Sequence, residues 1–409
     1  MERIKYLGLC LLCATVAGCT QPDREYADFS TFHVTSVRSG YVYQDNGYLN
    51  PEISLMEEPS LEDEPETKLA TTAAADLARN LMGNINSNRL DLVAGTYLGH
   101  DTDMSPLTQS GLLVIPQSGP IKNMILVSHY TIGANYESPS ETFPMEAALA
   151  SKGYVVVIAD YIGFGVTSHR IHPYLHMDSS SRSVVDMALA VKPYLKHIGR
   201  EPESEDVILV GYSQGGATTL AVMDLIQDEY SSVFPIKKVY CGGGPYDLAA
   251  TFDFSMKEDV TGIPCAIPMI VQGINEGAKL GLDMADFFQP NLLAHYDEWI
   301  NSKNYTVKQI NLLMNAKALH EIMTDKGRDK TSEETGRLYK ALMLNSVLNF
   351  EPQAPIFMFH STQDGTVPFV NAQSAEHYFK GRNIQFDFGE YGVHSAGCIR
   401  FLFTVAKDL

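Results

Sequence analysis

The fold is decided by residues 207–220, which read VILVGYSQGGATTL. The four leading apolar residues predict a buried strand, the Gly-x-Ser-x-Gly pattern predicts a sharp turn, and the residues after it predict a helix. Because glycine has no Cβ, Gly211 and Gly215 leave room for the strained backbone that projects a side chain from such a turn. We therefore expect the Ser213 hydroxyl to stand between a strand and a helix.

Apolar runs of the same kind recur along the chain and alternate with helical patterns. Strands that are apolar on both faces are typical of a parallel sheet covered by helices on each side. The sequence thus predicts an α/β fold with a doubly wound, mostly parallel sheet. The expected strands are 90–98 and 111–115 at a sheet edge, then 124–128, 155–159, 207–210, 239–241, 356–359 and 384–388, and the expected helices between them are 141–152, 179–197, 215–229 and 370–379.

The alternation of strands and helices stops between residues 247 and 349. There the spacing of Leu, Met and Tyr predicts helices over 283–302, 307–325 and 332–348. We interpret this segment, about 247–350, as a helical cap inserted over one edge of the sheet. The catalytic domain is then expected to run from residue 67 to residue 409 with the cap inside it. A final helix is expected after His394.

Two residues late in the chain can complete a catalytic triad with Ser213. A serine hydroxyl needs a base, and the base needs a carboxylate that orients it. Asp364 follows a predicted strand, and His394 follows the last one, so the order is Ser, Asp, His, as in the α/β-hydrolases. Asp247, which opens the helical insertion, is the rival carboxylate and ranks second for that reason.

An oxyanion-binding site is expected beside the serine. The N–H of Gln214 lies at the start of the predicted helix, where the positive end of the helix dipole favours a developing anion. A second donor should come from the loop after strand 124–128, and the N–H of Tyr130 or Thr131 is the candidate. His129 is expected to support that loop rather than to act as a base.

With these motifs assembled, the chain from about residue 97 onward resembles the α/β-hydrolases, and in particular the secretory-lipase branch of fungal and bacterial enzymes. The resemblance rests on HYT at 129–131, ADYIGFG at 159–165, HPYL at 172–175 before a helix with Asp186, and the serine, aspartate and histidine motifs. It implies cleavage of carboxylic esters beneath a helical lid. Tyr130 stands where the family commonly has glycine. Asp160 is interpreted as a structural brace of its loop.

The expected reaction is acyl transfer to water: Ser213 attacks an ester carbonyl, His394 moves the proton, and Asp364 holds the imidazole. No metal or organic cofactor is expected, and the substrate class is a small-molecule, lipid or glycan ester. One alternative is an exopeptidase or prolyl-type peptidase of the same fold, which would need cap acids turned toward the serine. Those acids are Asp283, Asp286, Asp297 and Glu298. A second alternative is a non-catalytic surface-binding lipoprotein.

The first residues resemble a bacterial lipoprotein signal. Arg3 and Lys5 precede an apolar stretch over 7–17, and the sequence VAGC at 16–19 matches a lipobox, whose cysteine is acylated. We expect a signal peptide over 1–18, a lipid anchor on Cys19 and an acidic tether over 19–66. The protein is therefore expected in the bacterial cell envelope, exported and attached to a membrane.

Composition and residue spacing limit the partners, metal sites and disulfides that the chain can have. The 409 residues carry 49 Asp and Glu against 30 Lys and Arg, which argues against nucleic acid as a partner. His169, His172 and His176 lack further ligands at metal-site spacing, so no metal site is expected. Beyond residue 19, the cysteines are Cys241, Cys265 and Cys398, and we expect buried free thiols.

Overall fold

The computed structural model describes residues 31–41, 89–260 and 262–409. The expected signal peptide, Cys19 and the start of the catalytic domain at residue 67 lie outside these residues, and so does most of the expected tether. Residues 33–41, however, form strand β1 of the main sheet, so the prediction that the whole of 19–66 is a tether is wrong. No helix in the described ranges is long and apolar enough to cross a membrane.

The described residues form a nine-stranded sheet with the order β1-β2-β3-β5-β4-β6-β7-β8-β9. Neighbours from β1 to β5 pair antiparallel, and all pairs from β5 through β4 to β9 are parallel, which confirms the doubly wound, mostly parallel α/β sheet. The strands are β1 (His33–Tyr41), β2 (Arg89–His100), β3 (Pro106–Pro116), β4 (Met124–Ser128), β5 (Val155–Ala159), β6 (Val207–Tyr212), β7 (Ile236–Gly242), β8 (Ile356–Ser361) and β9 (Ile384–Gly389).

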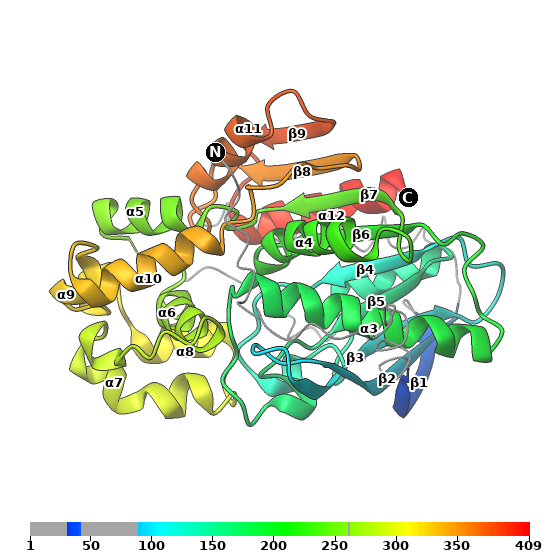
Figure 1. Cartoon of the computed structure of the whole chain (residues 1–409), viewed down its shortest axis with the longest axis horizontal. Helices are drawn as coiled ribbons and strands as arrows, with labels where there is room; N and C mark the ends of the chain where they lie inside the picture. The colour runs from blue at the N-terminus through cyan, green and yellow to red at the C-terminus, as the bar shows by residue number, and fades with distance from the viewer. Residues whose placement is uncertain (1–30, 42–88, 261) are drawn as a thin grey trace, which may run out of the picture.

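Helices cover both faces of the sheet (Figure 1). α3 (Met177–His197) and α4 (Gln214–Leu225) pack on one face, within the larger of two hydrophobic clusters. η3 (Met145–Lys152) and α12 (His394–Asp408) pack on the other face, within the second cluster. Since β4 to β9 run parallel, the loops that follow them share one edge of the sheet, where sites of open α/β sheets lie.

Two of the predicted helices differ in detail. The pattern over 141–152 becomes a 3₁₀ helix that begins only after Pro144, because a proline disfavours the helical conformation in the residue before it. The helix predicted over 215–229 continues from α4 into a π turn, η5 (Ile226–Tyr230). The predicted helix over 370–379 is α11 (Val370–Tyr378).

The segment between β7 and β8 is helical and gathers at one end of the molecule (Figure 1). The helix predicted over 332–348 corresponds to α10 (Glu333–Leu344), whereas the helices predicted over 283–302 and 307–325 are broken into shorter ones. Pro290 starts one helix, and Asn315 in the left-handed conformation ends another. The helices are α5 (Leu248–Glu258), α6 (Ala266–Gly277), η6 (Met284–Asp286), α7 (Pro290–Tyr296), η7 (Asp297–Asn301), α8 (Val307–Met314), η8 (Leu319–Glu321), α9 (Asp325–Arg328) and α10 (Glu333–Leu344).

Candidate active site

Ser213 occupies a strained turn between β6 and α4. Its φ of 58° and ψ of −127° lie in a sparsely populated region for any residue with a side chain. The turn closes tightly, since a Cβ on Gly215 would lie 1.9 Å from the carbonyl oxygen of Ser128, and one on Gly211 would lie 2.2 Å from that of Gly215. Glycine is therefore required at both positions, as the sequence pattern predicts.

Three buried side chains form a chain of hydrogen bonds at the carboxyl edge of the sheet. The Ser213 hydroxyl donates to Nε2 of His394 over 2.9 Å, and Nδ1–H of His394 donates to Oδ2 of Asp364 over 2.6 Å. Asp364 lies in the loop after β8, and His394 is the first residue of α12, after β9. The fold thus brings together residues 181 and 30 positions apart in the sequence.

Asp364 is held as an anion. Burial by itself would raise the pKa of this carboxyl, but the charge and hydrogen bond of His394 lower it below its usual value, with a smaller contribution from His360. Oδ1 of Asp364 also accepts the backbone N–H groups of Thr366 and Val367, each over 2.9 Å. The carboxylate is therefore fixed in the position that faces His394.

Asp247, the alternative candidate for the carboxylate beside His394, has a structural role instead. Asp247 is the N-cap of α5, and its side chain accepts the N–H of Ala250 over 3.0 Å. Its own N–H donates to Oδ1 of Asn371. The structure therefore places Asp364, not Asp247, against the imidazole of His394.

Sequence reasoning missed two residues that support this arrangement. His360 lies at the end of β8, with Nε2 3.7 Å from Oδ2 of Asp364 and 3.1 Å from the carbonyl oxygen of Val367. The hydroxyl of Tyr212 donates to the carbonyl of His394 over 2.9 Å. Both residues lie at the carboxyl end of a strand, Tyr212 immediately before Ser213 and His360 four residues before Asp364. This position in the sequence could have identified them.

The loop after β4 contains Tyr130 and Thr131, the two candidates for the second oxyanion donor. Nδ1–H of His129 donates to the carbonyl of Tyr130 over 2.6 Å. In a trans peptide the C=O and the following N–H point in opposite directions, so this bond turns the N–H of Thr131 away from His129. No described residue accepts the N–H of Thr131 or of Gln214. Burial lowers the pKa of His129 to about 4, so the ring is a neutral support and not a base at neutral pH.

The loop after β5 is braced by a buried carboxylate. Asp160 accepts the hydroxyls of Ser110 and Ser140 over 2.5 and 2.6 Å, and the N–H of Ser140 over 2.9 Å. A Cβ on Gly165, whose φ is +56°, would lie 2.1 Å from the carboxylate. These contacts fit the structural role that the sequence suggested for Asp160.

The three clustered histidines do not converge. Nδ1 of His172 contacts the carbonyl of Ile162, whereas Nδ1 of His176 contacts the hydroxyl of Ser179. Over the described ranges no group of three or more His, Cys, Asp or Glu side chains could hold a metal ion. Cys241, Cys265 and Cys398 are buried free thiols, which confirms the prediction for them.

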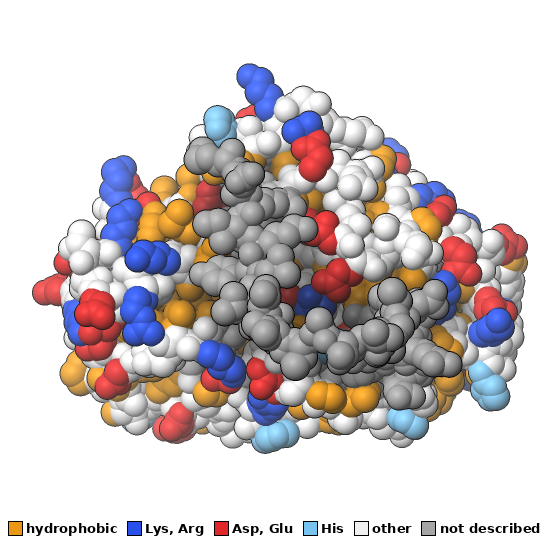
Figure 2. Space-filling model, in the orientation of Figure 1, with side chains coloured by type: hydrophobic (Ala, Val, Ile, Leu, Met, Phe, Trp, Pro, Cys, Tyr) orange, Lys and Arg blue, Asp and Glu red, His pale blue; other side chains and the backbone are white. Residues whose placement is uncertain are grey.

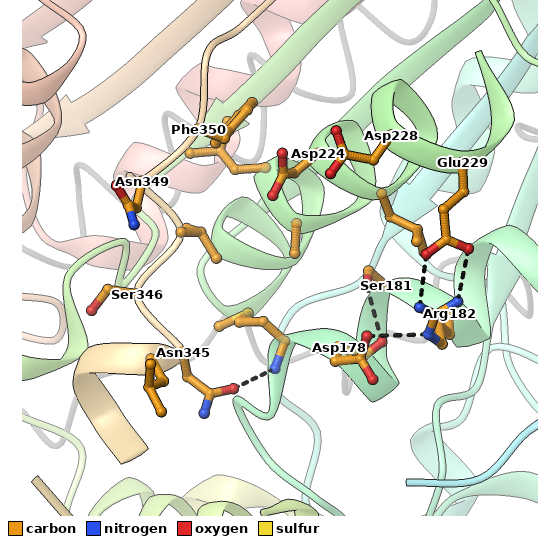
Figure 3. Close-up of a pocket in the computed structure, with 16 residues that line it drawn as sticks. Asp178, Ser181, Arg182, Asp224, Asp228, Glu229, Asn345, Ser346, Asn349 and Phe350 are labelled. Atoms are coloured by element: carbon orange, nitrogen blue, oxygen red, sulfur yellow. Dashed lines mark hydrogen bonds and ion pairs between the residues drawn. The ribbon is translucent and has the colours of Figure 1, made fainter. Parts of the chain in front are cut away.

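A cavity of about 350 Å³ lies away from the serine (Figure 3). Its wall includes Asp224 near the end of α4, which is roughly 16 Å from Ser213 at the rise of an α-helix. Arg182 inside it is paired with Asp178 over 3.1 Å and with Glu229 over 3.0 Å. On the face shown in Figure 2, the described Lys and Arg side chains are interspersed with Asp and Glu, so no patch of one sign dominates there.

Known proteins share the family and the fold of this chain. The family model of secretory lipases matches residues 139–397. The rice cell wall degrading esterase LipA from Xanthomonas oryzae is 25% identical, with a TM-score of 0.69 over 81% of this chain and 92% of its own. A putative hydrolase from Legionella pneumophila is 21% identical, with a TM-score of 0.71 over 81% of this chain and 94% of its own.

Candida antarctica lipase A is 19% identical, with a TM-score of 0.60 over 76% of this chain and 74% of its own. No curated protein sequence matches the chain. The structural likenesses establish the α/β-hydrolase fold, and the match to the family model extends from the loop after β4 to the first turn of α12.

Proposed function

The chain belongs to the secretory lipase family and is an ester-cleaving hydrolase, and from that premise we propose that it acts through Ser213, His394 and Asp364 as a catalytic triad with an acyl-enzyme intermediate. The observation that carries the proposal is the continuous hydrogen-bond chain from the serine hydroxyl to the buried carboxylate. The distances of 2.9 and 2.6 Å within this chain support the roles of nucleophile, base and orienting carboxylate.

In the first half-reaction, Oγ of Ser213 attacks the ester carbonyl while Nε2 of His394 takes its proton. The imidazolium that forms is stabilised by the Asp364 carboxylate, and it then protonates the leaving alcohol. Water attacks the acyl-enzyme in the second half-reaction, with His394 again moving the proton.

Two backbone N–H groups are proposed to bind the oxyanion. One is that of Gln214, at the N-terminus of α4, where the helix dipole favours negative charge. The other is that of Thr131, which the bond from His129 to the Tyr130 carbonyl turns away from the imidazole. The N–H of Tyr130 remains the alternative donor of this loop.

The peptidase alternative loses support at the cap. Asp283 caps a short helix, Asp286 pairs with Lys326, Asp297 accepts the amide of Asn301, and Glu298 contacts His295. These acids make contacts within the helical segment itself. A carboxylic ester is therefore the substrate class that we propose.

Export and anchoring are proposed from the sequence and the family. A signal over residues 1–18 with acylation of Cys19 would attach the catalytic domain to a membrane through the residues between Cys19 and β1. Incorporation of labelled fatty acid into the wild-type chain but not into Cys19→Ser tests the anchor. Equal incorporation into both would exclude Cys19 as the acylated residue.

The central experiment compares p-nitrophenyl esters of graded chain length with aminoacyl and prolyl p-nitroanilides, using the chain without residues 1–19. We expect ester turnover with little anilide cleavage. Ser213→Ala should keep the native circular dichroism spectrum and lower kcat by several orders of magnitude, because the nucleophile is lost. Ester turnover that survives in Ser213→Ala contradicts the triad assignment, and preferential anilide cleavage would make the enzyme a peptidase.

A further inference from the structure

His172 lies behind the nucleophile turn and contacts Gln214, the residue that follows Ser213. Nε2 of its ring is 3.3 Å from Nε2 of the Gln214 side chain, and Nδ1 is 2.6 Å from the carbonyl oxygen of Ile162. Both side chains are buried, with exposed fractions of 9% for His172 and 1% for Gln214. The contact joins the loop after β5 to the first turn of α4.

The two bonds assign one tautomer to the ring. The carbonyl of Ile162 can only accept, so Nδ1 of His172 carries a proton. The amide nitrogen of Gln214 can only donate, so Nε2 of His172 is the unprotonated acceptor. Burial, opposed only in part by the bond to Ile162, lowers the pKa of His172 to about 3, so the ring stays neutral across the working range of an ester hydrolase.

The ring itself is held firmly. Its centroid lies 4.9 Å from that of Phe164 and 5.8 Å from that of Tyr174. On the backbone side, Gly163 has a φ of +94°, and a Cβ there would lie 2.5 Å from Cα of His172. A cavity of only about 20 Å³, the space of one water molecule, remains beside the ring. His172 therefore has little freedom to follow a displaced Gln214.

We propose that His172 is a positioning residue, which acts by holding the Gln214 side chain and through it the N–H that binds the oxyanion. Gln214 is the first residue of α4, and its N–H has no partner among the described residues. Without His172 the buried amide loses its acceptor and has to rotate, which shifts the first turn of the helix. The inference deepens the proposed function and rests on it, because it assumes an oxyanion at Ser213.

A matched pair of variants separates the two hydrogen bonds of His172. His172→Asn keeps a donor for the Ile162 carbonyl but has no acceptor within reach of Gln214. His172→Gln places an amide oxygen near the position of Nε2 and keeps that acceptor. With the full chain and p-nitrophenyl butyrate as the probe, we expect His172→Asn to lower kcat about tenfold with KM unchanged, since the oxyanion exists only in the transition state. His172→Gln should recover most of that loss.

A double-mutant cycle tests whether His172 acts through Gln214. Gln214→Met removes the amide at similar size and should also lower kcat about tenfold. The double variant His172→Asn with Gln214→Met should match the worse single variant within twofold, because both changes break the same link. Inhibition by phenylboronic acid, which forms a tetrahedral adduct with the serine, should weaken in parallel with kcat.

The outcomes separate the inference from the proposed function. Losses that multiply in the double variant, or a kcat in His172→Asn equal to the wild-type value, overturn the role of His172. If His172→Asn does not fold, Gln214→Met carries the test alone, and an unchanged kcat there overturns the inference. Ester turnover that survives in Ser213→Ala refutes the proposed function instead, whatever the His172 variants do.

Discussion

At the residue scale, two aspartates with different neighbours test which carboxylate is the acid of the proposed triad. Asp364→Asn removes the charge that orients and stabilises the His394 imidazole, so we expect kcat to fall by about 10⁴-fold. Asp247→Asn is the matched control, because asparagine caps a helix about as well as aspartate, and kcat should change less than twofold. Steady-state kinetics with a p-nitrophenyl ester measures both. A larger loss in Asp247→Asn transfers the acid role to that residue.

A second buried carboxylate, that of Glu146, affects the stability of the fold. Both carboxylate oxygens of Glu146 lack a hydrogen-bond partner, and the residue is 1% exposed. Burial raises the pKa of Glu146 to about 7 from its usual 4.5. Burial raises the pKa values of Tyr130 and Cys398, and the nearby negative charge of Glu146 raises both further.

The raised pKa of Glu146 predicts that the free energy of unfolding depends on pH. Below pH 4.5 the group is protonated in both the folded and the unfolded chain, and no cost arises. Between pH 4.5 and 7, Glu146 ionises only in the unfolded chain, so the free energy of unfolding falls as the pH rises. Above pH 7 the folded chain is destabilised by the full amount, about 3 kcal/mol at about 1.4 kcal/mol per pKa unit.

Urea unfolding of the wild type and Glu146→Gln at pH 4.5 and pH 8 measures this cost. The wild type should lose about 3 kcal/mol relative to the variant over that interval. Glu141→Gln, at an exposed position in the same segment, should track the wild type. A pH-independent difference between the wild type and Glu146→Gln is incompatible with a raised pKa.

At the scale of elements, the helical segment is fastened to the loops of the active site. Nζ of Lys303 donates to the carbonyls of Ser168 and Arg170 over 2.9 and 2.5 Å, and the N–H of Asn135 donates to the carbonyl of Lys303 over 2.8 Å. A Cβ on Gly133 would lie 2.6 Å from the carbonyl oxygen of Tyr305. The segment therefore closes directly onto the loop that contains Thr131.

Gly133→Ala should disturb both packing and catalysis. The added methyl meets backbone atoms that cannot rotate away, so we expect a loss of about 1–3 kcal/mol in the free energy of unfolding. Because the loop also contains a proposed oxyanion donor, kcat should fall about tenfold or more. Gly336→Ala inside α10 is the control: its Cβ would lie 3.2 Å from the carbonyl oxygen of Lys330, a smaller overlap than at Gly133, and alanine favours the helix, so the loss of stability should be much smaller. Equal behaviour of the two variants argues against the close docking.

At the scale of the whole molecule, one hydrophobic cluster runs through both the sheet and the helical segment. Cys241 in β7 and Cys265 at the start of α6 belong to this cluster, whereas Cys398 in α12 belongs to the cluster on the opposite face. All three thiols are buried, and burial raises the pKa of Cys241 to about 12. Each thiol therefore reports the opening of its own region.

We expect a thiol reagent such as DTNB to leave all three cysteines unmodified in the native chain without residues 1–19. In increasing denaturant, Cys241 and Cys265 should become reactive at the same concentration, because the shared cluster couples the helical segment to the sheet. Mass spectrometry of the labelled peptides distinguishes the sites. Labelling of Cys265 well before Cys241 would show that the helical segment opens as a separate unit.

The sequence by itself determined the framework of this protein. Runs of apolar residues predicted the parallel sheet, and the Gly-x-Ser-x-Gly pattern predicted the backbone around Ser213. Both predictions hold because strand burial and the absence of a Cβ are properties of short segments. The order of Ser213, Asp364 and His394 followed from the same strands, since each residue lies in the turn or loop after one.

Only the tertiary structure decided which groups meet. The choice of Asp364 over Asp247 beside His394, and the approach of His360, His172 and Tyr212, depend on contacts between segments far apart in the chain. The helical segment was predicted in outline and wrongly in its helix boundaries, because Pro290 and Asn315 break its periodicity and packing selects the breaks. Local pattern fixes where a side chain stands on its own element, whereas packing fixes what that side chain faces.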